Sequence, residues 1–116
     1  MQVQLSTDSN IHGDERLTEV VQSTVQSTLG RFEPRITRVE VHLSDENAAK
    51  RQGDDKKCVM EARPAGMQPV AVTHFARNVD QAVTGAAERM QRLLDSAFGR
   101  QDTTKGGTPM SGRQSS

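Results

Sequence analysis

The stretch from Asn78 to Gly99, NVDQAVTGAAERMQRLLDSAFG, decides the fold. Asn78 is a good N-cap and Gly99 is placed as a helix stop, so we predict a helix between them. The apolar side chains recur at helical spacing and form one wide stripe, which consists of Val79, Ala82, Val83, Ala86, Ala87, Met90, Leu93, Leu94, Ala97 and Phe98. Several members of the stripe are alanines, so the helix can approach a sheet or a second helix closely.

A second amphipathic helix is predicted upstream, from Asp14 to Phe32. Asp14 and Glu15 lie at its N-terminus, where the helix dipole favours carboxylates. Pro34 stops the helix shortly after Phe32. Its apolar face consists of Leu17, Val20, Val21, Val25, Leu29 and Phe32.

Four segments show the alternation of apolar and polar residues that is typical of half-buried strands: 2–6, 36–43, 57–63 and 69–76. The turn residues between the last three favour an antiparallel meander. The element order is therefore β-α-β-β-β-α. Because each element has one apolar face, we predict a two-layer α+β sandwich, in which both helices cover one face of a four-stranded sheet. The opposite face would expose Arg38, Glu40, His42, Lys57, Glu61 and Arg63.

The composition fits one domain over residues 1–100 with a disordered polar tail over 101–116, which is rich in Gly, Ser and Thr. The 116 residues hold 15 Lys and Arg and 15 Asp and Glu. No apolar run is long enough for a membrane helix, and the N-terminus does not resemble a signal peptide. The lone cysteine, Cys58, suits a reducing compartment, so we expect a cytoplasmic protein.

Signatures of catalysis are absent from the sequence. It has no G-x-G-x-x-G, no phosphate-binding P-loop and no H-E-x-x-H motif. The three histidines, His12, His42 and His74, are far apart in the sequence. Cys58 lies on the predicted core face, where a free cysteine behaves as a small hydrophobic residue. We therefore expect no enzyme activity, no cofactor and no metal site. The chain has no Trp or Tyr and only three Phe, which argues against modules that stack single-stranded bases on exposed aromatics.

Clustered positive charge is the remaining functional signal. Arg31, Arg35 and Arg38 follow the first helix, and Arg89 and Arg92 lie three residues apart on the last helix. Such clusters bind phosphates even in a neutral protein. Nearby acids can neutralise them, and we expect Glu88 and Asp95 to pair with Arg89 and Arg92.

The element order and three segments of this chain, MQVQLSTDSNIHGDERL, RITRVEVHLSDENAAK and NVDQAVTGAAERMQRLLDSAFGR, resemble the ribosome hibernation-promoting factor family. This family is also called the ribosome-associated inhibitor A or ribosomal subunit interface family. The resemblance covers nearly all of residues 1–100. Because a short polar tail follows, the chain is similar to short-form members, which lack the second domain that pairs ribosomes.

The resemblance implies a non-enzymatic inhibitor that binds the small ribosomal subunit and occludes the mRNA and tRNA paths in stressed or stationary cells. We expect a monomer whose partner is this subunit, not DNA or a membrane. The candidate rRNA contacts are Arg16, Arg31, Arg35, Arg38, Lys56, Lys57, Arg89, Arg92 and Arg100. The zero net charge leaves an alternative open, a divergent protein-interaction or stress module that kept the fold and lost rRNA binding.

Overall fold

The computed structural model describes residues 1–46 and 55–106, with the side chains of 101–106 outside the description. The predicted element order is confirmed. The elements are β1 (Gln2–Thr7), α1 (Glu15–Leu29), the 3-10 helix η1 (Gly30–Arg35), β2 (Ile36–Asp45), β3 (Lys56–Pro64), β4 (Val70–Ala76) and α2 (Val79–Gly106).

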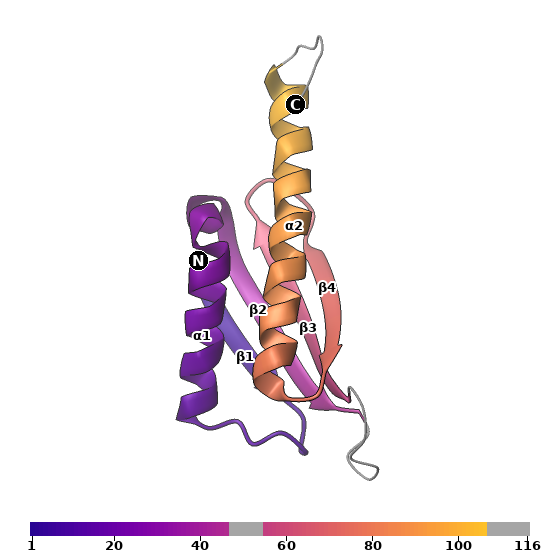
Figure 1. Ribbon diagram of the computed structural model, residues 1–116. Helices are drawn as coiled ribbons and strands as arrows, with labels where there is room; N and C mark the ends of the chain where they lie inside the picture. The colour runs from indigo at the N-terminus through magenta and orange to yellow at the C-terminus, as the bar shows by residue number, and fades with distance from the viewer. Residues whose placement is uncertain (47–54, 107–116) are drawn as a thin grey trace.

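The four strands form one mixed sheet in the order β1-β2-β3-β4 (Figure 1). β1 is parallel to β2 because α1 carries the chain back across the sheet between them. β2, β3 and β4 are joined as the predicted antiparallel meander. The register aligns one apolar residue from each strand across the sheet, namely Leu5, Val41, Met60 and Val72.

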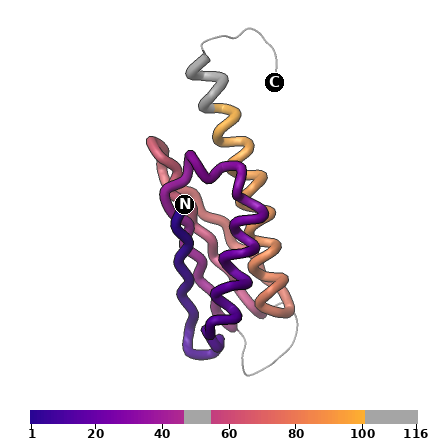
Figure 2. The backbone as a smooth tube through the Cα atoms, turned by 90° about the vertical axis from the view of Figure 1, so that its left-hand side faces the viewer, coloured from indigo at the N-terminus to yellow at the C-terminus, as the bar shows by residue number. Residues whose placement is uncertain are grey.

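Both helices lie on one face of this sheet, as predicted (Figure 2). α2 packs against β3, β4 and α1, and its small residues Ala82, Ala86 and Ala87 are completely buried. The alternation of the strands therefore separates an apolar face under the helices from a polar outer face. Burial of apolar surface stabilises a fold by about 25 cal/mol per Å², so this core is the main source of stability.

The first helix is shorter than predicted. Asp14 is its N-cap, and the Asp14 carboxylate accepts a hydrogen bond from the Leu17 backbone N–H at 2.9 Å, which lowers the carboxyl pKa. The α-helix ends at Leu29, and residues up to Arg35 form η1, which contains Pro34. The tighter turn brings Phe32 against Phe98 of α2, with ring centroids 5.5 Å apart.

The second helix is longer than predicted. Asn78 caps it by accepting a 2.8 Å hydrogen bond from the Gln81 backbone N–H, as expected. The predicted stop at Gly99 is wrong, because α2 continues to Gly106 and so includes residues assigned to the tail. Gly99 does not adopt a positive φ, and a helical glycine costs only about 1 kcal/mol relative to alanine. The rest of the predicted tail, 107–116, lies outside the described residues.

Candidate nucleic-acid interface

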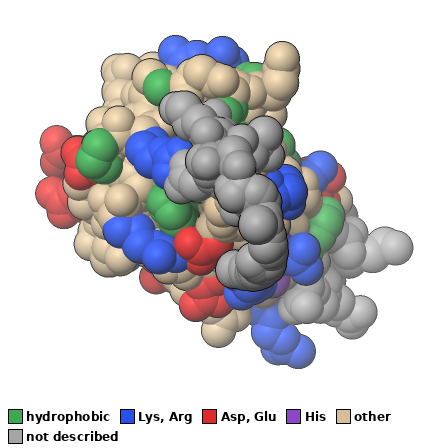
Figure 3. All heavy atoms as spheres, turned by 90° about the horizontal axis from the view of Figure 1, so that it is seen from above, with side chains coloured by type: hydrophobic (Ala, Val, Ile, Leu, Met, Phe, Trp, Pro, Cys, Tyr) green, Lys and Arg blue, Asp and Glu red, His purple; other side chains and the backbone are tan. Residues whose placement is uncertain are grey.

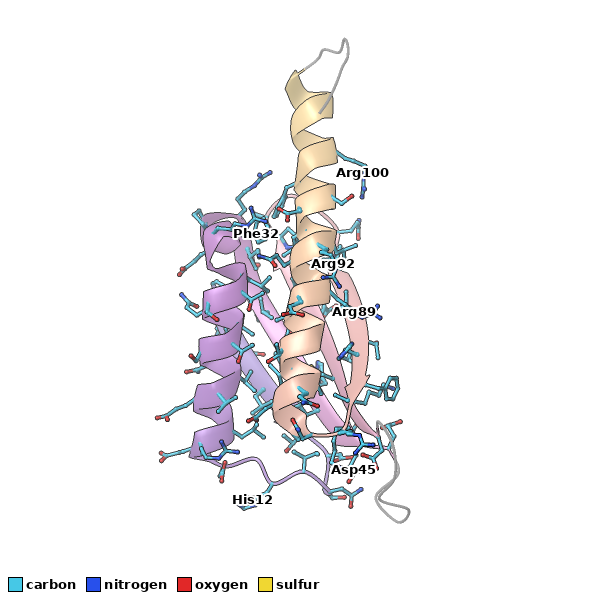
Figure 4. The ribbon with its side chains drawn as sticks, in the orientation of Figure 1. His12, Phe32, Asp45, Arg89, Arg92 and Arg100 are labelled. Atoms are coloured by element: carbon cyan, nitrogen blue, oxygen red, sulfur yellow. The ribbon has the colours of Figure 1, made fainter. Side chains whose placement is uncertain are left out.

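A row of arginines follows one side of α2. Arg89, Arg92 and Arg100 are exposed and, together with Ser96, recur at intervals of three or four residues, which places them on one helix face. Figure 4 shows the three arginines along the front of α2 and its β4 side. Arg100 Nη1 donates a hydrogen bond to Ser96 Oγ at 2.7 Å. We call Arg89, Arg92 and Arg100 the α2 stripe.

The neighbouring acids do not neutralise the α2 stripe. The Asp95 carboxylate pairs instead with the guanidinium of Arg31 in η1, on the other flank of the helix. Within residues 1–46 and 55–100, no carboxylate forms an ion pair with the α2 stripe. The expected pairing of Arg89 and Arg92 with Glu88 and Asp95 is therefore wrong. The three guanidinium groups of the α2 stripe are therefore without an ion-pair partner among the described residues.

η1 brings two further candidates to the C-terminal half of α2. The Arg35 guanidinium lies 3.9 Å from the ring centroid of Phe98, and that of Arg31 lies 4.6 Å from the ring centroid of Phe32. The contact of Arg35 with Phe98 holds η1 against α2, whereas the contact of Arg31 with Phe32 lies within η1. Figure 3, which looks down on this end of the molecule, shows Lys and Arg side chains around α2 with acidic side chains between them.

Lys56 and Lys57 lie at the opposite end of the sheet and are engaged by acids. The Lys56 ammonium is 2.9 Å from Asp55 Oδ1 and 3.5 Å from Asp45 Oδ2. Its hydrogen bond to Asp55 raises the lysine pKa. Lys57 lies 3.9 Å from Glu46. The structure therefore does not join these lysines to the α2 stripe.

The remaining candidates, Arg16 and Arg38, are also separate from the α2 stripe. Arg16 is exposed in the first turn of α1. Arg38 lies on the outer face of the sheet, where its guanidinium is 2.9 Å from Glu40. Across from it in the register, Arg63 lies 3.6 Å from Glu61, so this face alternates in charge. The nine candidates thus fall on several surfaces, and Arg31, Arg35 and the α2 stripe form the largest group.

His74 is a site residue that sequence reasoning missed. Its Nδ1 accepts a hydrogen bond from Arg89 Nε at 3.3 Å, which places it beside the α2 stripe. It borders a groove of about 550 Å³ between β4 and the N-terminal half of α2. His74 also lies against Gly85 of α2, where a Cβ would be 2.2 Å from the imidazole. That relation needs the packing of α2 on β4 and is invisible in the sequence alone.

The structure also shows the surroundings of Cys58, the lone cysteine of the chain. Cys58 is buried as predicted, and burial raises the pKa of its thiol to about 12, which keeps it protonated. It pairs in register with His74, whose Nδ1 is already engaged by Arg89. Among the described residues, no cluster of His, Cys, Asp or Glu could hold a metal ion. No helix within 1–46 and 55–106 is long and apolar enough to cross a membrane.

The fold is thus a two-layer α+β sandwich with a row of exposed arginines along its C-terminal helix. The chain belongs to the Sigma 54 modulation protein / S30EA ribosomal protein family, whose model matches residues 5–101. This membership confirms the resemblance that the sequence showed.

Two solved structures share the fold. The N-terminal domain of Thermus thermophilus Protein Y matches with a TM-score of 0.68 and 15% sequence identity over 84% of this chain and 99% of that one. A ribosomal subunit interface protein from Coxiella burnetii matches with a TM-score of 0.66 and 10% identity over 85% of this chain and 99% of that one. No curated protein is significantly similar in sequence.

Proposed function

We propose that this protein is a translation inhibitor that binds the rRNA of the small ribosomal subunit and occludes the mRNA and tRNA sites. The observation that carries the proposal is the α2 stripe, whose three guanidinium groups have no acidic partner among the described residues. The chain that bears this stripe belongs to a ribosomal protein family. We expect it to act as a monomer in the cytoplasm of stressed or stationary cells.

The proposed mechanism needs no bond chemistry. The guanidinium groups of the α2 stripe bind rRNA phosphates, and each contact releases condensed counterions. Arg31 and Arg35 extend this surface across η1, although Arg31 must first leave Asp95. Arg16, Arg38, Lys56 and Lys57 are kept as peripheral contacts, because they lie apart from the α2 stripe and the last three already form ion pairs with acids. The bound body then excludes mRNA and tRNA by volume.

The double variant Arg89→Ala, Arg92→Ala tests the proposal. Both side chains are exposed, so folding should change by no more than about 0.5 kcal/mol per site. Co-sedimentation with small subunits should weaken, and the slope of log affinity against log salt should fall by roughly 0.7–0.9 for each rRNA phosphate that the variant no longer neutralises. Inhibition of a cell-free translation extract should weaken in parallel.

Arg63→Ala is the matched control, because it removes one arginine from the outer sheet face and is not a candidate contact. It should bind like the parent at every salt concentration. If the double variant also binds and inhibits like the parent, the α2 stripe is only a solvated surface and the proposal fails.

The alternative function, a protein-interaction module, is favoured by the outer sheet face. Its ion pairs Arg38–Glu40 and Arg63–Glu61 give a surface of alternating charge that suits a protein better than a phosphate backbone. This function becomes the better explanation if the parent fails to sediment with ribosomes even at low salt.

A further inference from the structure

His74 and Arg89 are held together at the edge of the α2 stripe. Arg89 Nε donates to His74 Nδ1, and the imidazole lies against the backbone of α2 at Gly85. An arginine only donates hydrogen bonds, so Nδ1 must be unprotonated for this bond to exist. The hydrogen bond from Arg89 therefore requires the neutral form of His74.

Protonation changes what this pair can bind. The imidazolium loses its acceptor, so the hydrogen bond from Arg89 breaks and two cations lie side by side. An anion between them would satisfy both, as charge-assisted hydrogen bonds from nitrogen donors to a phosphate are strong. The pair then presents one more positive charge than it does when His74 is neutral.

Other charged groups face His74 from the elements around it. From α2, Asp80 and Glu88 line the same groove, and Arg89 contacts the ring; Arg77 follows β4 and lines the groove as well. From β3, the facing residue is Cys58, which stays neutral because its thiol pKa is raised to about 12. Two carboxylates and one guanidinium group therefore share the groove with the imidazole, and Arg89 contacts it. A phosphate bound at the ring would add negative charge that favours the protonated form.

We propose that His74 and Arg89 form one phosphate-binding site, at which binding of an rRNA phosphodiester is accompanied by uptake of a proton on His74. This inference rests on the proposed function and adds a contact that depends on pH. Acidic conditions favour the protonated ring, so acidification of the cell would strengthen ribosome binding.

The test compares small-subunit binding near pH 6 and near pH 8, across the range in which imidazole side chains ordinarily change charge. For the parent, small-subunit affinity should be higher near pH 6 than near pH 8, because the protonated ring adds a second charge-assisted contact to the phosphate that Arg89 binds. His74→Gln keeps a neutral acceptor for Arg89 and should lose this difference. His42→Gln, which removes an exposed imidazole from the outer sheet face, is the matched control and should keep it.

Calorimetry of the parent gives a second reading that needs no variant. Binding heats measured in buffers of different ionisation enthalpy should reveal proton uptake near neutral pH. If the parent binds without proton uptake, or if His74→Gln keeps the full pH difference, the inference fails while the proposed function stands. If the parent does not bind at either pH, both fail.

Discussion

The imidazole of His74 in β4 lies so close to Gly85 of α2 that a Cβ at position 85 would stand 2.2 Å from its Cδ2 and Nε2 atoms. Glycine in the middle of a helix is unfavourable by roughly 1 kcal/mol relative to alanine. Its presence here lets the ring reach Arg89. The position of the His74 ring in the sheet thus depends on a glycine at position 85 in the helical layer.

Substitution of Gly85 should reveal this coupling, because its effect on the free energy of unfolding should depend on whether His74 is present. In the parent, Gly85→Ala should fail to stabilise, since the new Cβ displaces the His74 ring. In a His74→Ala background the same change should stabilise by about 1 kcal/mol, because only the helix propensity remains. Urea unfolding of the four proteins measures both effects. Equal effects in the two backgrounds would contradict the close approach of the ring to α2.

Asp95→Asn should strengthen ribosome binding. The change releases Arg31 from its ion pair and removes a negative charge beside the α2 stripe, so the salt dependence of binding should become steeper. Stability should fall by no more than about 1 kcal/mol, since both partners are exposed. Co-sedimentation over a salt series checks the result. Weaker binding by this variant would show that Asp95 helps the interface and does not oppose it.

Phe98→Ala should destabilise the fold by about 3–5 kcal/mol, as for other buried aromatic truncations. Phe98 is only 4% exposed, packs against Phe32 and carries the guanidinium of Arg35 on its ring. Denaturant unfolding measures the decrease. Ser96→Ala, close to the ring in sequence and exposed, is the control and should stay within about 0.5 kcal/mol. A similarly small decrease for Phe98→Ala would mean that η1 does not depend on this ring.

Cys58 should make the protein sensitive to alkali and resistant to thiol reagents. Its pKa is about 12 in the fold, against an ordinary value of 9.0, so between these values the folded state keeps a proton that the unfolded state releases. Stability should then fall by about 1.4 kcal/mol for each pH unit above the ordinary pKa and be unaffected below it.

Unfolding of the parent and of Cys58→Ala, compared near pH 8 and near pH 10, isolates this contribution, because every other titrating group is shared. The variant should show the flatter pH dependence. Rapid labelling of the native thiol near pH 8 would contradict the prediction and reopen the question of a reactive cysteine.

The sequence predicts the fold well because alternation and helical spacing are local patterns. Val39, Val41 and Leu43 mark the buried face of β2, and their burial in the structure confirms that all three belong to the core. Asn78 is recognised as a cap because a cap acts through residues three positions away. Asp14 is predicted only as the first residue of the helix that it in fact caps. The stop at Gly99 fails because a glycine permits the end of a helix but does not require it.

The site is predicted less well because it depends on interactions between distant segments. Arg89 and Arg92 can be placed on one helix face from their spacing alone. That Asp95 pairs with Arg31, and that His74 meets Arg89, follows only when η1 and β4 are packed against α2. Sequence spacing measures neighbours along a helix, whereas the availability of a charge depends on neighbours in space.

Co-sedimentation of the parent protein with purified small ribosomal subunits, with and without prebound mRNA and tRNA, tests the central claim most directly. The account predicts that the protein pellets with empty subunits, that binding weakens steeply as salt rises, and that prebound mRNA and tRNA prevent it. If the protein stays in the supernatant at low salt, or pellets equally well with subunits that carry mRNA and tRNA, the account of binding and occlusion is wrong.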